Sequence, residues 1–429
     1  MIIVLHITPH LGGGVGKAIS GLIAQARASN ASVRHIVACL EKPEKSQFVE
    51  RILKSGGEVI AAPDRQSIDA LVATADIVQL EWWNHPATIE CLCNLAPKPL
   101  RLLVWCHVSG LHNPIIPLGL MEASHRFLFT SPCTFEAREV SSLAGRLGNR
   151  LSVVSSGGGF DGLPEPVEND QSPLSVGYFG SLNFAKLHPA YFEFLSAVNL
   201  PGFTVKLIGD LLNRETLEKQ CESAGRSGIL DFRGYTTDVA AELRSINVLA
   251  YLLNPRHYGT AENALLEAMA MGIVPIVLDN PAERHIVEHL CTGLIVHSPD
   301  EFSDAIDWLE HNPSNRSRIG MQAAAMVRER FTAEKMEASL SSHYEDVMDE
   351  DKKLVPFRGI FGTKPDEWFL SCQREPEIFG EDGEVYLPTE RFSSFNLLEK
   401  TKGSVFHFLE HYPESTRLQS WATRLETLR

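Results

Sequence analysis

Short apolar runs recur along the first 300 residues of this chain, and longer stretches with helical spacing separate them. Each run holds four to eight residues rich in Val, Ile and Leu, as a buried strand of a parallel sheet does. Strand and helix alternate throughout, which predicts an α/β protein with parallel sheets covered by helices. The predicted strands are 2–7, 33–40, 58–61, 77–80, 99–106, 125–131 and 151–155, then 175–179, 203–208, 229–233, 248–253, 273–278 and 292–296.

The two sets of strands predict two domains of similar design. Residues 161–172 are acidic and polar with prolines close by, and we interpret them as a linker. The expected domains are 1–165, 174–348 and a C-terminal extension, 349–429. The extension holds too many aromatic residues for a disordered tail. We expect it to pack on the body or on a second subunit, and to act on acceptor access or on assembly into a homo-oligomer.

The charge and the cysteine content limit the classes of partner and metal site that the protein can have. The net charge of −15 argues against a nucleic acid. Residues 1–165 contain 14 Lys+Arg and 14 Asp+Glu, so the acidic excess lies beyond them, and a weak membrane-surface contact is left open for the first half only. The eight cysteines are scattered, which favours buried thiols in a cytoplasmic protein over a zinc site. No signal peptide is visible, and no apolar run approaches the roughly 20 residues of a membrane span.

A glycine-rich segment, His10–Gly16, follows the first predicted strand, and a helix is expected at 17–29. Strand, glycine loop and helix together open a βαβ unit. The segment is not a P-loop, because Lys17 is followed by Ala18, and its glycines do not meet the G-x-G-x-x-G spacing. The alternative is an ordinary structural turn.

The sequence NPRHYGTAENALLEAMAMGIVPIVLD, residues 254–279, indicates turn, helix, stop and strand. We expect Thr260 to cap a helix over 261–271, which Gly272 ends. A helix N-terminus attracts anions, and Glu267 lies two turns further on, where a carboxylate can accept hydrogen bonds from ribose hydroxyls. This is a nucleotide-binding layout. The alternative is a core helix that leads into a core strand.

The stretch LLEAMAMGIVPIV resembles the second half of the E-x7-E signature of retaining GT-B glycosyltransferases, the large family four of nucleotide-sugar enzymes. The resemblance implies that Glu267 binds the donor ribose and that the amides around Ala261, Glu262 and Asn263 meet the diphosphate and the sugar. The first Glu of the signature falls at Gly259, so that contact is missing, and Glu262 is the nearest substitute.

The segment GSLNFAKLHP resembles the G-R-L-x-x-x-K segment of the same family, whose Arg and Lys neutralise the donor diphosphate. Lys186 falls on the Lys and is the expected cationic group. Ser181 falls on the Arg, so one contact is missing, and Arg256 is a candidate replacement. The resemblance is loose over 1–348 and specific within about 176–296.

The first half also resembles the family at two places. The glycine loop, with Gly13 and Gly14, matches the loop that faces donor phosphates and acceptor. His107 ends a predicted strand where the family has a His that reaches the donor sugar, although a structural strand-end His is the alternative. Trp82 and Trp83 suit either a sugar-stacking platform or core packing.

The resemblance implies two Rossmann-like domains that face each other across a cleft. It also implies a retaining transfer of sugar from a nucleoside-diphosphate sugar to a glycan, lipid-linked or small-molecule acceptor, in glycan or polysaccharide biosynthesis. His107 and Lys186 are the expected catalytic residues. We expect no cofactor and no metal, because the Asp349–Asp351 D-x-D lies in a charged linker far from the site. A GT-B nucleotide-sugar epimerase, or a catalytically weak scaffold partner of another glycosyltransferase, remains open.

Overall fold

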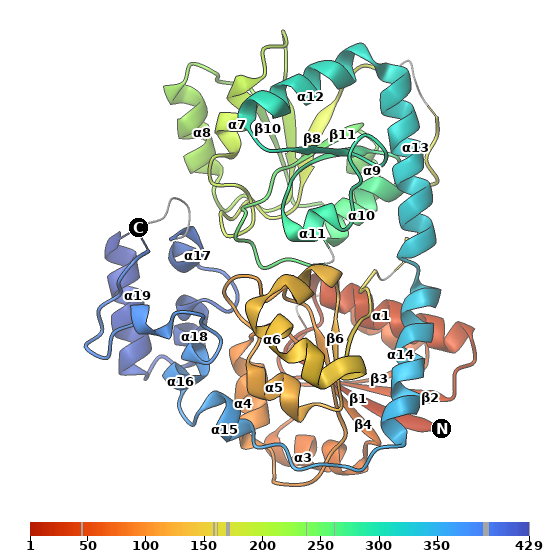
Figure 1. The fold of residues 1–429 in the computed structure, drawn as a ribbon, viewed down its shortest axis with the longest axis vertical. Coiled ribbons are helices and arrows are strands. Elements are labelled where there is room, and N and C mark those ends of the chain that lie inside the picture. The colour runs from red at the N-terminus through yellow and green to blue at the C-terminus, as the bar shows by residue number, and fades with distance from the viewer. Residues whose placement is uncertain are drawn as a thin grey trace. The chain divides into compact units, whose positions relative to one another are not determined.

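The fold was analysed in a computed structural model that describes residues 1–43, 46–157, 159–160, 162–168, 172–236, 238–260, 262–388 and 394–428. The chain forms two compact units. The first contains Met1–Gly159, Tyr258–Ala261 and Ala333–Arg429, and the second contains Phe160–His257 and Glu262–Thr332. Each unit is built on one parallel sheet, as the alternation of strands and helices predicts (Figure 1).

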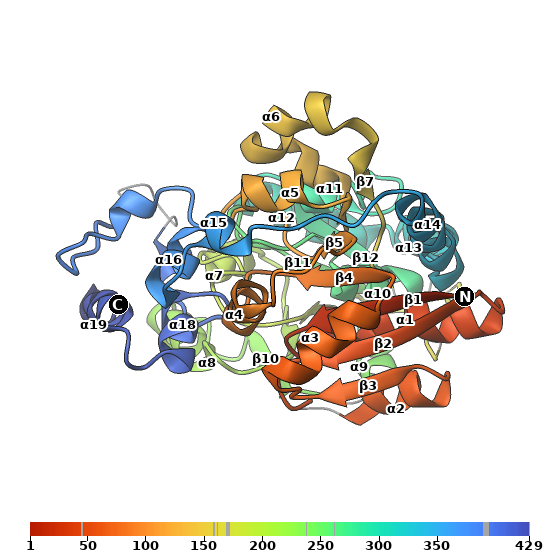
Figure 2. The same ribbon diagram turned by 90° about the horizontal axis from the view of Figure 1, so that it is seen from below.

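The first unit contains a seven-stranded sheet in the order β3-β2-β1-β4-β5-β6-β7. Figure 2 shows β3, β2, β1, β4 and β5 side by side in that order. All of the pairings are parallel, so the carboxyl ends of the strands lie along one edge. The strands are β1 Ile2–Thr8, β2 Val33–Cys39, β3 Glu58–Ala61, β4 Ile77–Trp82, β5 Leu102–Cys106, β6 Arg126–Phe129 and β7 Leu151–Val153.

Helices cover both faces of this sheet. One face packs on α1 (Gly13–Ala28), α2 (Ser46–Lys54) and α14 (Ala333–Met348). The other face packs on α3 (Arg65–Thr74), α4 (Pro86–Asn94), α5 (Leu118–Ala123) and α6 (Arg138–Leu147). Strand residues alternate between the two cores: Ile77 joins the α1 and α14 side, and Val78 joins the other. Two short 3-10 turns, η1 Pro132–Glu136 and η2 Gly148–Arg150, complete the connections.

The second unit contains a six-stranded sheet in the order β10-β9-β8-β11-β12-β13. Its strands are β8 Val176–Phe179, β9 Val205–Ile208, β10 Leu230–Gly234, β11 Val248–Tyr251, β12 Val274–Leu278 and β13 Leu294–Val296. Its helices are α7 Tyr191–Ala197, α8 Arg214–Ser223, α9 Val239–Leu243, α10 Asn263–Ala270, α11 Pro281–Arg284, α12 Pro299–His311 and α13 Pro313–Arg330. In the part of the chain that the structure describes, none of the helices combines the length and apolar character needed to cross a membrane.

The domain boundaries differ from the expected ones at α14. We expected Ala333–Met348 to close the second domain, but this helix belongs to the first unit. Its apolar residues Met336, Leu340 and Val347 pack on the first sheet together with α1. The first unit therefore combines both ends of the sequence.

The C-terminal extension is also part of the first unit rather than a separate domain. The core on the sheet face that packs on α3 to α6 also contains Trp368, Phe408 and Trp421 of the extension. This agrees with the expectation that the extension packs on the body. Figures 1 and 2 show its helices beside α4. These elements are α15 Phe357–Phe361, α16 Pro365–Leu370, η3 Pro376–Ile378, α17 Phe395–Leu398, α18 Val405–His411 and α19 Thr416–Leu428.

Candidate functional site

The second sheet changes direction between β8 and β11, which are neighbours in space although the chain first runs outward to β9 and β10. In open α/β sheets, ligands bind beyond the carboxyl ends of the strands at such a switch point. The segment with Ser181 and Lys186 follows β8, and the segment with Arg256 and His257 follows β11. Helix α10 begins shortly afterwards. The predicted donor residues of the second half therefore converge on one place.

In the turn after β8, the backbone of Gly180 lies very close to the backbone of Gly209. A Cβ atom on Gly209 would lie 1.8 Å from the carbonyl oxygen of Gly180, so this position requires glycine. Ser181 follows, and its hydroxyl accepts a hydrogen bond from Nδ2 of Asn183 at 2.6 Å. The Ser181 side chain is thus engaged locally, and it does not extend as the expected Arg would.

Lys186 is fixed through both its backbone and its side chain. Its N–H donates to the carbonyl of Asn183 at 3.0 Å, and its carbonyl accepts from the N–H of Asn254 at 2.7 Å. The Nζ atom lies 3.0 Å from Oε2 of Glu262 and 5.9 Å from the centre of the Tyr251 ring. Lys186 is therefore placed at the switch point with its charge already matched by a carboxylate.

Glu262 precedes α10 and has a left-handed backbone, with φ 40° and ψ 59°. Its side chain is only 1% exposed and accepts a hydrogen bond from the Tyr251 hydroxyl. Burial raises the pKa of Glu262, but the charges of Lys186 and His257 outweigh this effect and lower it. Glu262 is therefore an ionised, buried group.

Helix α10 begins two residues later than expected, at Asn263, because Glu262 takes the non-helical position before it. The prediction that Thr260 caps this helix was wrong: its hydroxyl lies 2.6 Å from that of Thr130, in the first unit. Ala261 lies outside the described residues.

The first turn of α10 contains no acidic residue, and its leading amides have no partner inside the helix. Asn263 is therefore placed where an anion would be attracted. Glu267 is partly buried one turn further along the same helix. Arg256 is also partly buried, and its backbone N–H donates to Oδ1 of Asn254 at 2.9 Å.

His257, Glu262 and Glu283 form a buried group whose ligand atoms all lie within 4.8 Å of one another. The His257 Nε2 atom lies 3.2 Å from Oε1 of Glu283. Burial lowers the pKa of His257, but the charges of Glu283 and Glu262 outweigh it and raise the pKa. Lys186, Glu262, His257 and Glu283 thus form a buried chain of neighbouring ionisable groups.

In the first unit, His107 directly follows β5 at its carboxyl end, as predicted. Its Nε2 atom lies 2.8 Å from Oε2 of Glu81, and its side chain is 8% exposed. Glu81 was not expected as a site residue, because the predicted strand ended at residue 80 whereas β4 extends to Trp82. A charged residue next to a predicted buried strand was the available signal.

Glu81 is fully buried and accepts further hydrogen bonds at Oε1, from Nδ1 of His6 at 3.1 Å and from Nε2 of Gln79 at 2.8 Å. Burial raises the pKa of Glu81, but the hydrogen bonds from His107 and His6 outweigh it and lower the pKa. The ionised carboxylate therefore fixes the proton of His107 on Nε2. Behind it, His6 contacts His35 at 2.9 Å and Gln79 accepts from the Tyr344 hydroxyl at 2.6 Å.

Two other expectations for the first half change. Gly13 and Gly14 form the exposed first turn of α1 rather than a loop before it. Trp82 is fully buried and stacks on Phe361 of the extension with ring centroids 5.4 Å apart, so it is a core residue and cannot form a sugar platform. Trp83 is partly buried, and its ring lies 4.9 Å from that of His10.

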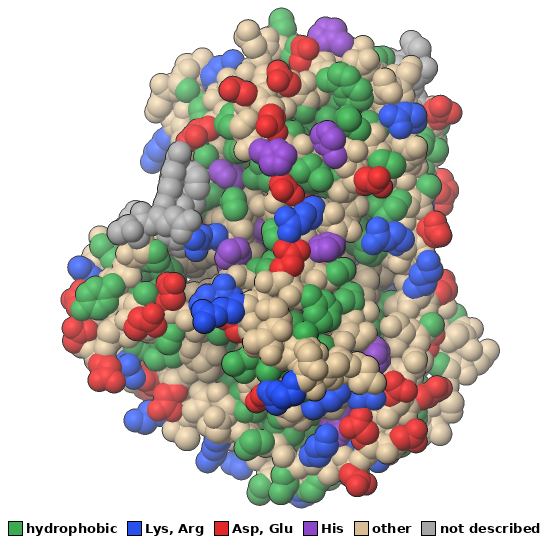
Figure 3. Space-filling view, in the orientation of Figure 1, with side chains coloured by type: hydrophobic (Ala, Val, Ile, Leu, Met, Phe, Trp, Pro, Cys, Tyr) green, Lys and Arg blue, Asp and Glu red, His purple; other side chains and the backbone are tan. Residues whose placement is uncertain are grey.

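On the face shown in Figure 3, Lys and Arg side chains are interspersed with Asp and Glu. The expectation of a partner other than nucleic acid, drawn from the net charge, stays a prediction.

Two Rossmann-like domains with parallel sheets define the GT-B fold of glycosyltransferases, and solved GT-B structures resemble this one. Anabaena Alr3699/HepE in complex with UDP-glucose has a TM-score of 0.61 at 17% identity, over 81% of this chain and 100% of that one. Sucrose-phosphate synthase from Thermosynechococcus elongatus has a TM-score of 0.60 at 13% identity, over 81% and 99%. A mutant of S. aureus TarM in complex with Fondaparinux, alpha-GlcNAc-glycerol and UDP has a TM-score of 0.61 at 9% identity, over 82% and 100%.

A family model gives a more specific match. Residues 164–326 match the model described as "Glycosyl transferases group 1". This range contains the segments after β8 and β11 and the whole of α10. No curated protein sequence matches this chain.

Proposed function

We propose that this protein is a retaining glycosyltransferase that moves a sugar from a nucleoside-diphosphate sugar to an acceptor hydroxyl. The observation that carries the proposal is the meeting of Lys186 with the N-terminus of α10 at the switch point of the second sheet. This place lies within the range that matches group 1 glycosyltransferases. The similar HepE structure contains UDP-glucose, which supports a nucleotide sugar as the co-substrate.

The second unit would hold the donor. The leading amides of α10, from Asn263 onward, suit the diphosphate, because they combine free N–H groups with the positive end of the helix dipole. Lys186 would supply a full positive charge to the same group. Glu267, further along the helix, would accept the ribose hydroxyls, and Arg256 would supply charge that Ser181 lacks.

Glu262 would position Lys186 rather than touch the donor. Its side chain is almost fully buried and holds Nζ at 3.0 Å. A cation fixed before the reaction needs no reorganisation when negative charge develops on the leaving diphosphate. Lys186 would then contact Glu262 and the diphosphate at the same time. The resemblance instead implies an Arg and a Lys on the diphosphate.

The first unit would supply His107 to the donor sugar. With the proton fixed on Nε2 by Glu81, the neutral ring offers a lone pair at Nδ1 to a sugar hydroxyl. If the ring is protonated, Nδ1 donates instead, and the carboxylate of Glu81 stabilises the imidazolium. Glu81 is thus a positioning residue for His107. The exposed first turn of α1, with Gly13 and Gly14, would face phosphate groups.

We propose a reaction without a metal or another cofactor, since amides and Lys186 would meet the charge of the leaving group. The acceptor would be a glycan, a lipid-linked sugar or a small molecule, in glycan or polysaccharide biosynthesis in the cytoplasm. One competing proposal has specific support: Gly259 and Ser181 replace two expected donor contacts, and the charge of Lys186 is matched by Glu262. These features favour a catalytically weak partner of another glycosyltransferase.

A thermal-shift panel of nucleosides, nucleoside diphosphates and nucleotide sugars tests the proposal. We expect stabilisation by one nucleotide sugar and its diphosphate, and little by the nucleoside. Turnover of the stabilising sugar separates an enzyme from a binding partner. If no nucleotide stabilises the chain, the glycosyltransferase proposal is contradicted and the partner proposal is favoured.

A further inference from the structure

The first sheet also has a switch point, between β1 and β4, from which the chain runs outward in both directions. His10 follows the end of β1, and His85 follows the end of β4. Both therefore lie at the edge where ligands bind in such sheets. Neither residue has a role in the donor site proposed above.

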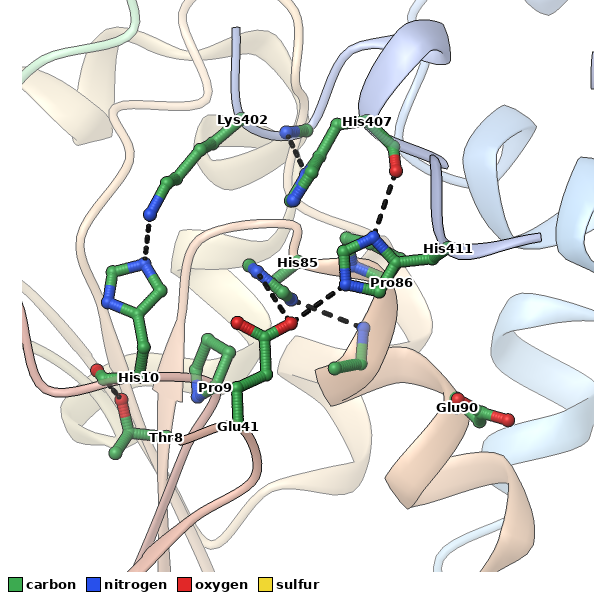
Figure 4. Close-up of polar contacts among 12 residues, drawn as sticks. Thr8, Pro9, His10, Glu41, His85, Pro86, Glu90, Lys402, His407 and His411 are labelled. Atoms are coloured by element: carbon green, nitrogen blue, oxygen red, sulfur yellow. Dashed lines mark hydrogen bonds and ion pairs between the residues drawn. The ribbon is translucent and has the colours of Figure 1, made fainter. Parts of the chain in front are cut away.

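The C-terminal extension covers this place (Figure 4). The Lys402 Nζ atom lies 2.7 Å from Nε2 of His10, and the His407 ring packs edge-on against the His85 ring with centroids 4.6 Å apart. The His411 Nε2 atom lies 2.8 Å from Oε1 of Glu41, which follows β2. The extension thus forms one wall of the crevice at the switch point.

A cavity of about 580 Å³ lies between this wall and the sheet edge. Ligand pockets usually measure about 300–1,000 Å³. Glu41 and His85 line it from the first half of the chain, and the extension contributes Lys402, Phe406, His407 and His411. The cavity is therefore large enough for a substrate group.

Backbone contacts fix which ring atoms carry protons. The Nδ1 atom of His85 accepts from the N–H of Ala87 at 3.2 Å, and Nδ1 of His407 accepts from the N–H of Gly403 at 2.9 Å. A neutral imidazole that accepts at Nδ1 carries its proton on Nε2. Burial and neighbouring charges lower the pKa of His407 to about 4, so this ring is neutral near pH 7. Both rings consequently offer Nε2–H donors.

These tautomers disfavour a metal, although ring nitrogens of His85, His407 and His411 lie within 4.8 Å of one another. A metal on Nε2 requires the proton on Nδ1, usually donated to a carbonyl. His411 meets this requirement, with Nδ1 at 3.0 Å from the carbonyl oxygen of His407. His85 and His407 are held in the opposite tautomer.

Charges of both signs line the cavity: the cations are Lys400 and Lys402, and the carboxylates are Glu41, Glu410 and Glu426. Lys400 pairs with Glu426 at 2.6 Å, and His411 pairs with Glu41. Lys402 is exposed, its contact is the His10 ring, and no carboxylate of a described residue lies within ion-pair distance of its Nζ. His85 Nε2 lies 3.7 Å from Glu41, beyond hydrogen-bond distance. Lys402 and two N–H donors therefore face the same cavity.

We propose that the extension completes a phosphate-binding subsite in the first unit, where Lys402 and the Nε2–H groups of His85 and His407 hold a phosphate of the acceptor. This proposal rests on the proposed function, because the phosphate-bearing ligand is an acceptor only if the protein is a glycosyltransferase. Three donors suit the several oxygens of a phosphate, and charge-assisted hydrogen bonds are the strong ones. The phosphate belongs either to a soluble sugar phosphate or to a lipid headgroup.

The test follows the ring signals of His85 and His407 by NMR in the full-length protein, assigned with His85→Gln and His407→Gln. Inorganic phosphate is the probe. We expect it to shift both signals in the wild type, and Lys402→Met to weaken the apparent affinity about tenfold or more. Lys400→Met is the matched control, because its charge is paired with Glu426. Lys186→Met removes any phosphate bound at the donor site and leaves these shifts unchanged.

Two further titrations separate the sources of the phosphate. Glucose 1-phosphate binding more tightly than glucose identifies a soluble acceptor. Vesicles of phosphatidic acid that compete where phosphatidylcholine vesicles do not identify a lipid headgroup. The proposal is overturned if phosphate leaves both signals unmoved, if Lys402→Met responds like the wild type, or if Zn²⁺ binds stoichiometrically through these rings and displaces phosphate.

A measurement of nucleotide binding shows whether the phosphate subsite or the proposed glycosyltransferase function has failed. If nucleoside diphosphates bind and the phosphate shifts are absent, the subsite is wrong and the glycosyltransferase stands. If the shifts are present and no nucleotide binds, the anion site stands and the proposed function fails.

Discussion

The Nε2 atom of His107 lies 2.8 Å from Oε2 of Glu81, a fully buried carboxylate on the neighbouring strand. We expect Glu81→Gln to lower kcat more than it changes KM, because the amide removes the charge that orients His107 and stabilises its protonated form. A decrease of about 10²-fold or more is expected if His107 acts in the reaction.

The control is Tyr344→Phe, which removes the hydroxyl bound to Gln79 at the far end of the same network. It should cost about 1 kcal/mol of unfolding free energy and leave kcat unchanged. Equal kcat values for Glu81→Gln and Tyr344→Phe would show that the network is structural only.

Lys186→Met should weaken the binding of a nucleoside diphosphate far more than that of the nucleoside, because the Lys charge serves the diphosphate. Calorimetry of both ligands on the folded variant is the measurement. Since Glu262 would be left buried without its cation, a loss of about 3 kcal/mol or more of stability is also expected. Equal loss of affinity for both ligands would remove Lys186 from the diphosphate site.

Glu267→Ala should cost about 1–3 kcal/mol of nucleotide affinity if the carboxylate accepts a buried hydrogen bond from ribose. A 2′,3′-dideoxy nucleotide lacks the partner hydroxyls and should bind wild type and variant alike. If Glu267→Ala binds the normal nucleotide as tightly as the wild type, the ribose assignment is wrong.

The extension should be required for the stability of the first unit. Trp421 is fully buried in the core that contains the sheet, so Trp421→Ala should cost about 3–5 kcal/mol of unfolding free energy. A chain that ends at Met348 would expose this core and should aggregate. Urea unfolding of Trp421→Ala, compared with the exposed position in Leu428→Ala, measures the effect. Equal midpoints would contradict it.

The histidines of the extension should make stability depend on pH in opposite directions. The folded pKa of His407 is about 4, below the unfolded value near 6.5, so stability falls as the pH drops from 6.5 towards 4. His407→Gln should reduce this fall by roughly 1–2 kcal/mol at pH 5. The hydrogen bond to Glu41 raises the pKa of His411, so its contribution is full below about pH 6.5 and is lost at higher pH. Urea midpoints of His411→Gln at pH 6.5 and 8 should therefore differ less than those of the wild type.

Much of the fold could be predicted from the sequence, because parallel strands buried on both faces leave short apolar runs such as 273–278. The place of Lys186 after β8 and of His107 after β5 also followed from the pattern. The position of α14 could not be predicted, since a helical stripe shows that a face is buried but not which sheet buries it. Glu81 and the Lys186–Glu262 pair were missed because such buried contacts depend on tertiary placement and, at Glu262, on a left-handed backbone.

Proton NMR of the nucleotide sugar selected by the thermal-shift panel, incubated with the protein and with water or an added acceptor, tests the central proposal most directly. We expect the donor signals to decay to nucleoside diphosphate, and the released or transferred sugar to appear first with the anomeric configuration of the donor. The Lys186→Met protein should slow this decay strongly. A donor that binds yet remains intact, or a product that first appears with inverted configuration, would contradict a retaining glycosyltransferase.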